Sequence, residues 1–307
     1  SKYFPKQARR DVGPDGVPFE VTINAHGFRG RDYTPDKPPG TLRVVALGAS
    51  STFGFGNRDA ETYPALLETL LNERLENRAC RGSTRAEVIN LGIPHLDVRQ
   101  VSALFRAEGI AYRPDVVTLY SGYNDTRGLG RNALLTTLSR RSLVANFLRV
   151  LRQQSTRISP EELTTQRDIR VSNYLRGLDE ILATARLENM ALVPLTQQAT
   201  SLPPGVDARK GVTYPGEMVM LQNKLETAGQ VSLLEGKLLI HGGLMRALAH
   251  WAAENGLETV DIIGLLDHHR YLLNTYVHLS PLGNDLIALA IADRIAEQLD
   301  CPVLATP

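Results

Sequence analysis

The sequence predicts an α/β fold in which helices cover both faces of a parallel β-sheet. Short apolar runs of strand length alternate along the chain with longer segments of helical periodicity. Several of these runs are continuously apolar, which is typical of strands buried on both faces. Strands that alternate with helices are joined by right-handed crossovers in a parallel sheet. At 307 residues, the chain is long enough for one large domain with a complete core.

Each element follows from a local pattern. The first buried strand is the apolar run LRVVAL, and a helix opens after it at Thr62-Tyr63-Pro64, with proline in its first turn. Ser280-Pro281 marks the start of the last helix in the same way. The expected strands cover residues 20–24, 42–47, 87–90, 116–120, 191–196 and 259–263. The expected helices cover residues 64–75, 98–108, 169–189, 233–255 and 282–298.

The pattern also suggests how the chain is organised. Residues 1–40 are polar and rich in Pro and Gly, so we expect an N-terminal extension packed on a domain of residues 41–307. Residues 127–168 and 199–232 fit the alternation poorly. We expect these two segments to be insertions that lie over the functional site.

Composition narrows the range of partners. The formal net charge is +1, with 22% charged residues, so there is no global electrostatic reason to expect nucleic acid or an anionic membrane as partner. No apolar run is long enough to cross a bilayer. A membrane contact is therefore expected only through an anchor upstream of Ser1. Cys80 and Cys301 match no metal motif, and whether they pair is left open.

Chemistry in open parallel sheets lies at the carboxyl ends of the strands. This rule selects three loops, residues 48–54, 91–95 and 121–126, together with the loop that leads into the last helix. These loops offer a serine, a glycine, an asparagine and a histidine in turn.

Each of these residue types has a chemical use. Ser50 lies on a turn among small residues, where a nucleophilic hydroxyl needs to be. Gly92 lets a backbone N–H approach a ligand, and Asn124 adds an amide donor, so that both could stabilise an oxyanion together with the Ser50 N–H. His278 supplies a base of suitable pKa.

These positions resemble the four sequence blocks of the SGNH (GDSL-like) hydrolase superfamily. The blocks are GASSTFG at 48–54, INLG at 89–92, GYND at 122–125 and HLSPLGN at 278–284. The segment NAHGFRG at 24–30 resembles the lead-in of bacterial, often envelope-associated members. The resemblance runs from about residue 20 to residue 299.

The resemblance implies a flavodoxin-like three-layer α/β/α sandwich. It also implies Ser50 as nucleophile, His278 as base, and Ser50, Gly92 and Asn124 as oxyanion donors. Members act as esterases, lipases, acyltransferases and carbohydrate deacetylases, usually without metal or cofactor, so neither is expected here. The bacterial cell envelope or periplasm is favoured over the cytoplasm.

Two positions depart from the pattern of the superfamily. Ala49 replaces the aspartate before the nucleophile, and Thr275 stands where the triad aspartate would precede the histidine. The backbone carbonyl of Asn274 or Thr275, the side chain of Asn274, or Asp267 folding back are alternative acceptors for His278 Nδ1–H. A neutral acceptor still orients the ring but stabilises the imidazolium less. We therefore expect a Ser-His dyad that is slower than a full triad.

The side chains beside the site have less specific interpretations. Phe53, Tyr123 and His95 are candidates for substrate binding, although core packing fits Phe53 at least equally well and a surface position fits His95 better. Ser50 alone would fit an ordinary turn or a phosphate loop. However, no lysine follows at the spacing that a phosphate loop requires.

The leading hypothesis is hydrolysis of a small-molecule or glycan ester, with O-acyl groups on a carbohydrate as one substrate class. Acyl transfer to an alcohol would use the same residues. A third hypothesis is a carbohydrate-binding protein that kept the fold and lost turnover, which the missing aspartate favours.

Overall fold

The centre of the structure, a computed structural model that describes residues 6, 8–13, 15–76, 79–129 and 155–301, is a parallel sheet. Its strands lie in the order β4 (Arg85–Asn90), β3 (Thr41–Gly48), β5 (Val116–Tyr120) and β7 (Ala191–Leu195). Counted along the chain this order is 2-1-3-4, the order in which flavodoxin-like sheets begin. All pairs are parallel, as the sequence predicts.

Helices cover the sheet on both faces. All eight residues of β3 are buried, and its successive side chains point to opposite faces. Val44 and Ala46 pack in a cluster with α2 (Tyr63–Leu75) and α11 (Pro281–Gln298). Val45 and Leu47 pack in the cluster that contains residues of α3 (Val98–Leu104), α6 (Pro160–Leu187) and α9 (Leu233–Glu254). The predicted three-layer sandwich is therefore confirmed.

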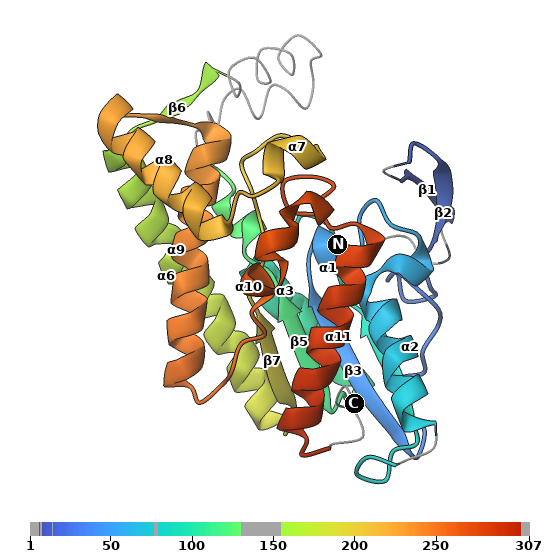
Figure 1. Cartoon of the computed structure of the whole chain (residues 1–307). Helices are drawn as coiled ribbons and strands as arrows, with labels where there is room; N and C mark the ends of the chain where they lie inside the picture. The colour runs from blue at the N-terminus through green and yellow to red at the C-terminus, as the bar shows by residue number, and fades with distance from the viewer. Residues whose placement is uncertain (1–5, 7, 14, 77–78, 130–154, 302–307) are drawn as a thin grey trace.

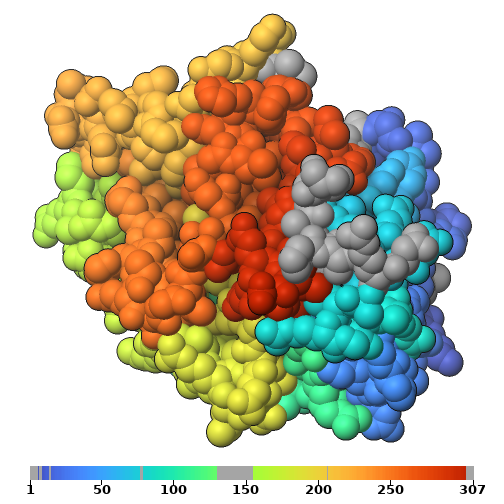
Figure 2. Space-filling view, turned by 60° about the horizontal axis from the view of Figure 1, so that its bottom comes forward, coloured from blue at the N-terminus to red at the C-terminus, as the bar shows by residue number. Residues whose placement is uncertain are grey.

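The two helical layers differ in their members. Figure 1 shows α6 (Pro160–Leu187) beside α9 (Leu233–Glu254) on one flank, and α2 with α11 on the other. Arg74 Nη1 of α2 donates to Asp293 Oδ1 of α11 at 2.9 Å, which links these two helices at their surface. In Figure 2 the red C-terminal segment lies against the cyan segment that includes α2.

The remaining elements are short or lie outside the central layers. The further strands are β1 (Ala8–Val12), β2 (Pro18–Thr22), β6 (Arg157–Ile158) and β8 (Val231–Ser232), which pair β1 with β2 and β6 with β8. The further α-helices are α1 (Ser50–Phe53), α3 (Val98–Leu104), α7 (Val206–Arg209), α8 (Tyr214–Ala228) and α10 (Ile262–Leu266). A π-helical turn covers Phe105–Gly109, and 3₁₀ turns cover Asp59–Glu61, Ile110–Tyr112, Tyr123–Thr126 (η4) and Asp267–Leu272. Among the helices of the described residues, none combines the length and hydropathy that a membrane crossing requires.

The predicted strand at 259–263 is wrong in extent. Only a single parallel bridge, between Leu195 and Val260, forms at this edge of the sheet. The next residue, Asp261, accepts a hydrogen bond from Gly264 N–H and caps α10, so the chain turns into a helix before a strand can extend.

The predicted start of the long helix at 169 is also wrong. The helix α6 begins at Pro160, after Ser159 has accepted a hydrogen bond from Glu162 N–H. This serine-proline start with two acidic residues in the first turn is a recognisable signal, and it lies in the segment expected to be an insertion. The other part of that insertion, residues 130–154, lies outside the described residues.

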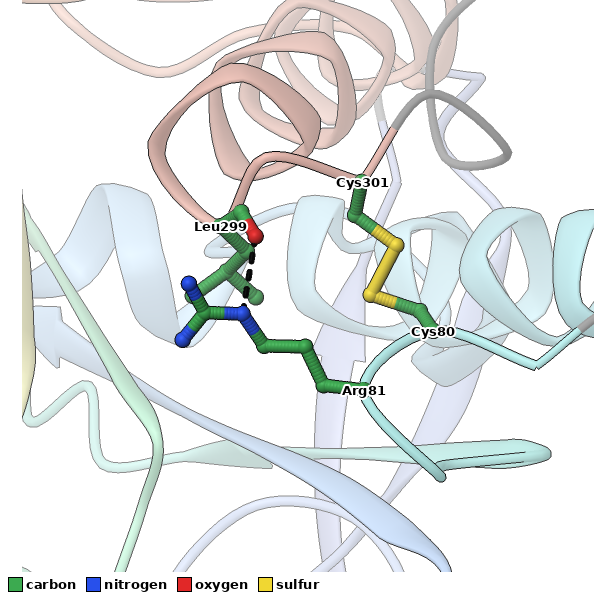
Figure 3. Close-up of a disulfide and its surroundings, with 4 residues drawn as sticks. All are labelled: Cys80, Arg81, Leu299 and Cys301. Carbon is green, nitrogen blue, oxygen red and sulfur yellow. Dashed lines mark hydrogen bonds between the residues drawn. A yellow bond between two sulfur atoms is a disulfide. The ribbon is translucent and has the colours of Figure 1, made fainter.

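Cys80 and Cys301 form a disulfide, which answers the question that the sequence leaves open. Figure 3 shows this bond, with Arg81 Nε donating to Leu299 O at 2.8 Å beside it. Cys80 precedes β4, so the disulfide ties the C-terminal end of the described chain to the amino ends of the strands. This is the end of the sheet opposite to the one at which the loops after β3 and β5 lie.

Candidate active site

Ser50 is the first residue of α1 and follows directly on the end of β3. The turn between them requires glycine, because a Cβ on Gly48 would lie 2.1 Å from Thr52 Oγ1 and 2.5 Å from Tyr120 O. Ala49 is the N-cap of α1 and makes no side-chain cap. The first N–H groups of a helix have no intrahelical acceptor, so the Ser50 N–H is left for a ligand.

The guanidinium of Arg29 supports this turn through hydrogen bonds to backbone carbonyl groups that follow the serine. Its Nη1 donates to Phe53 O at 3.0 Å and to Gly54 O at 2.8 Å, and its Nη2 donates to Asn57 O at 2.6 Å. Its Nε donates to Asp59 Oδ1 at 2.8 Å. The lead-in segment 24–30 therefore satisfies the carbonyl groups that end α1, and it holds the serine turn in place.

His278 lies in a tight loop between residues 273 and 279, which are joined by an antiparallel bridge. Two side chains near the serine hold this loop: Ser51 Oγ donates to Val277 O at 3.3 Å, and Asn57 Nδ2 donates to Leu279 O at 3.0 Å. From the other side, the N–H of Thr200 donates to Tyr276 O at 2.9 Å.

The segment 199–232 was expected to lie over the site, but none of its residues lines the pocket around Ser50. It contacts the histidine loop instead, through Thr200 and through the buried Arg209, whose Nη1 donates to Leu273 O. This segment therefore supports the loop that carries the histidine.

The serine and histidine side chains meet. The distance between Ser50 Oγ and His278 Nε2 is 2.8 Å, and the distance between His278 Nδ1 and Thr275 Oγ1 is also 2.8 Å. When Nδ1 carries the proton, it donates to the threonine hydroxyl, and Nε2 is left to accept the serine proton.

Of the three expected partners of the histidine ring, only Thr275 contacts it, and it does so through its side chain rather than its carbonyl. The backbone N–H of Asn274 donates to His278 O at 2.7 Å, and its side-chain Nδ2 donates to Leu279 O at 3.3 Å. Asp267 accepts from Tyr214 N–H and does not fold back to the ring.

Burial controls the charge of the histidine. Desolvation lowers the pKa of His278 from 6.5 to about 4, and the charge of Asp11 opposes this change only partly. The ring of Phe55 lies against the imidazole with 4.8 Å between ring centroids. His278 is therefore neutral at pH 7, which is the state that a general base needs.

The backbone N–H of the predicted donor Gly92 has a hydrogen-bond partner within the protein. Its N–H donates to Asn90 Oδ1 at 2.9 Å, and the residue does not line the pocket. A Cβ at this position would lie 2.2 Å from Phe53 N, so the glycine is required for the close approach of its loop to α1. Close packing against α1 therefore accounts for a glycine at this position.

His95, in the same loop, does line the pocket, together with Ile93 and Pro94. Its φ is 77°, a left-handed conformation that residues other than glycine adopt rarely and that concentrates at functional sites. Among the described residues, no acceptor pairs with the backbone N–H of His95 or of Ser50. The residue type of His95 does not reveal this φ, so the sequence alone gives no signal for the His95 N–H.

Asn124 lies on η4, next to the pocket. One N–H of its amide donates to Leu96 O at 3.0 Å, and the amide has a second N–H. The turn is held by Gln197, whose Oε1 accepts the Tyr123 N–H at 2.7 Å and whose Nε2 donates to Ser51 Oγ at 3.3 Å. Gln197 thus joins the serine turn to the asparagine turn, a role that the sequence pattern did not reveal.

The site opens into a pocket of about 700 Å³. Tyr123 and His95 line it, as expected, and Phe55 lines it beside the histidine. Phe53 was a candidate for substrate binding, but it is fully buried against Val21 and Ile23. Phe55, two residues later, lines the pocket instead, because α1 ends at Phe53 and the chain turns at Gly54. Within the described residues, no three His, Cys, Asp or Glu side chains gather as metal ligands.

Comparison with known proteins gives matches only among solved structures. No protein-family profile and no curated protein matches the chain. A gut microbial diltiazem-metabolizing enzyme is 14% identical over 84% of this chain and 48% of its own, with a TM-score of 0.50. A GDSL-like lipase from Bacteroides thetaiotaomicron VPI-5482 is 14% identical over 84% of this chain and 89% of its own, with a TM-score of 0.46. An acetylxylan esterase from Geobacillus stearothermophilus is 14% identical over 87% of this chain and 97% of its own, with a TM-score of 0.48.

At such low identity, likeness to a solved structure shows a shared fold. The strand order and the helical layers are those of a three-layer α/β/α sandwich. The four sequence blocks lie along the chain in an order that agrees with this architecture. The chain shares its three-layer α/β/α fold with the diltiazem-metabolizing enzyme.

Proposed function

We propose that this protein is a serine esterase that cleaves its substrate through an acyl-serine intermediate. The observation that carries the proposal is the distance of 2.8 Å between Ser50 Oγ and His278 Nε2, at the floor of a pocket. A nucleophile and a base within hydrogen-bond distance, with the base oriented by a third group, are the arrangement that activates a hydroxyl.

In the proposed mechanism, His278 accepts the Ser50 proton as the oxygen attacks the ester carbonyl. The imidazolium then returns this proton to the departing alcohol. Water, activated by the same histidine, attacks the acyl-serine and releases the acid. The Ser50 N–H, the His95 N–H and the Asn124 amide are the proposed donors to the oxyanion of both tetrahedral intermediates.

Thr275 makes this a Ser-His dyad with a neutral orienting group. The threonine hydroxyl holds the ring in position, but it carries no charge to stabilise the imidazolium. Burial opposes the same charge, as the lowered pKa of His278 indicates. We therefore expect turnover that is slower than that of a complete triad and that persists to low pH.

A carbohydrate O-acyl ester in the cell envelope stays the predicted natural substrate. The Cys80–Cys301 disulfide supports an oxidising compartment such as the periplasm, because disulfides persist in such environments and are rare in the cytosol.

A fluorophosphonate probe and an aryl acetate test the proposal together. We expect the probe to label Ser50, the aryl acetate to be hydrolysed, and Ser50→Ala to abolish both. The neighbouring Ser51→Ala is the matched control and should keep the label, because Ser51 Oγ bonds Val277 O and Gln197 rather than the histidine. Labelling that survives Ser50→Ala, or no labelling and no turnover with the parent protein, would contradict the proposal. Product analysis with added glycerol would show acyl transfer if an acylglycerol replaces the free acid.

A further inference from the structure

The charge of the pocket is one-sided. Of the described residues that line it, four have basic side chains: Arg9, His95, Arg127 and His278. No aspartate or glutamate is among these lining residues. The other walls are largely apolar and include Phe55, Ile93, Pro94, Leu96, Tyr123 and Val277. A cleft with one sign of charge and low-dielectric walls attracts ligands of the opposite sign.

Arg127 is held beside the proposed oxyanion donors. It is the C-cap of η4, and its backbone N–H donates to Asn124 O at 3.1 Å. Its Nη1 donates to His95 O, and its own carbonyl accepts from Arg170 Nη2 at 2.8 Å. The guanidinium is therefore anchored to the same two turns that carry the donors, and it needs little reorganisation to meet a substrate.

Arg9 approaches the pocket from a different part of the chain. It lies on β1, in the N-terminal hairpin, and its guanidinium lies 5.9 Å from the centroid of the Phe53 ring. Thus the hairpin of β1 and β2 contributes a cation to the lining of the pocket. Arginine is suited to this position, since its planar fork matches a carboxylate.

The electrostatic effects on His95 agree with the position of Arg9 and Arg127 at the pocket. The pKa of His95 is lowered by burial and then by the charges of Arg127 and Arg9, which places both cations within electrostatic range of the pocket. Asp11, two residues after Arg9, acts on His278 in the opposite sense. Its carboxylate accepts from Val12 N–H and, at 3.4 Å, from Gly56 N–H, and it is not a lining residue. The Asp11 charge therefore also reaches the histidine, whereas Arg9 and Arg127 are the charged side chains that line the pocket itself.

We propose that the natural substrate is an ester that carries a carboxylate, and that Arg9 and Arg127 bind this carboxylate while Ser50 attacks the ester carbonyl. This inference rests on the proposed esterase function and specifies its substrate class. Charge-assisted hydrogen bonds to arginine give both affinity and orientation, which is how a remote group can position a scissile bond.

Matched esters test the inference. On the alcohol side, 3-acetoxybenzoate is compared with 3-acetoxybenzamide, which has the same shape without the charge. On the acyl side, the monophenyl ester of succinate is compared with phenyl succinamate. We expect kcat/KM to be about 10- to 100-fold higher for the anionic ester in at least one pair. The pair that shows the preference identifies the side of the ester that carries the carboxylate.

Variants then assign the preference to the two arginines. Arg9→Gln and Arg127→Gln should each lower the ratio of the two kcat/KM values, mainly through a higher KM for the anionic ester, and Arg127→Lys should restore part of it. Arg113→Gln is the matched control, because Arg113 pairs with the exposed Asp36 and does not line the pocket. A ratio near one in both pairs, or a ratio that survives both glutamine variants, would overturn the inference while leaving the esterase intact.

The failure of the esterase proposal would be distinguishable. If no ester is cleaved and Ser50 is not labelled, the proposed function is wrong, and the inference is then decided by binding. Calorimetry with the Ser50→Ala protein compares 3-hydroxybenzoate with 3-hydroxybenzamide. Tighter binding of the benzoate, lost in Arg127→Gln, supports an anion-binding pocket. Equal binding of both compounds rejects it.

Discussion

Replacing Thr275 with aspartate places a carboxylate beside the Nδ1 of His278, where a neutral hydroxyl now lies at 2.8 Å. Burial lowers the pKa of His278 from 6.5 to about 4, which corresponds to about 3 kcal/mol against the imidazolium. A carboxylate about 4 Å from the imidazolium contributes about 4 kcal/mol at an effective dielectric constant of about 20. The added charge is therefore large enough to offset the effect of burial.

Two changes in kinetics follow from this offset. The acid limb of the profile of kcat/KM against pH should move from near pH 4 in the parent protein to about pH 6–7 in Thr275→Asp. Above that limb, kcat should rise about 10- to 100-fold, because about 1.4–2.7 kcal/mol of the added stabilisation reaches the transition state. Stopped-flow or spectrophotometric assays with an aryl acetate between pH 3.5 and 9 measure both quantities.

Thr275→Asn is the control, since it has nearly the same shape as the aspartate without its charge. We expect it to leave the acid limb near pH 4. A sharp loss of activity in Thr275→Asp, with the limb unmoved, would refute the reasoning. Such a result would mean that the loop does not present residue 275 to the histidine during turnover.

Three further predictions concern stability and are measured by urea denaturation. Arg29→Met should lower the free energy of unfolding by about 3–5 kcal/mol, because it leaves three carbonyl groups and Asp59 without their charged partner. A change below about 1 kcal/mol would contradict this support role. Replacing Cys80 and Cys301 by serine should lower the free energy of unfolding by about 2–5 kcal/mol. Ester turnover at 25 °C should persist, since the disulfide lies at the end of the sheet opposite to the candidate site. Lost turnover in a folded variant would disprove this separation. Burial raises the pKa of Asp125 from 3.8 to about 7, so its contribution to stability is complete below pH 3.8 and is lost as pH rises through 7. Asp125→Asn should therefore gain up to about 4 kcal/mol relative to the parent protein between pH 4 and pH 8, and parallel pH profiles of the two would exclude this effect.

Much of the fold follows from local patterns. The strand at 116–120 was predicted with its observed bounds, and the strand in 42–47 within one residue at each end, because continuous apolar runs between turn residues have few other uses. The edge of the sheet was less predictable. A run such as 259–263 becomes a strand only if a neighbour pairs along its length, and Asp261 ends that pairing by capping a helix.

Some features of the candidate site could be predicted from the sequence and others could not. The pairing of Ser50 with His278 follows from topology, since residues at the carboxyl ends of parallel strands meet at one edge of the sheet. The proposed oxyanion donors do not follow from the sequence, because the direction of an N–H depends on backbone torsions and on competing acceptors. Asn90 takes the Gly92 N–H, and the left-handed φ of His95 is visible only in the folded chain.

The sequence by itself determined the class of fold, the four loops that build the candidate site and the pairing of Ser50 with His278. These features depend on residue type and on order along the chain, which a single sequence contains. The tertiary structure alone decided that Thr275 orients the histidine with its hydroxyl, that Phe53 is core, that Cys80 and Cys301 pair, and that Arg9 reaches the pocket. Each of these depends on contacts between residues far apart in the chain, whose distances and directions are set by packing.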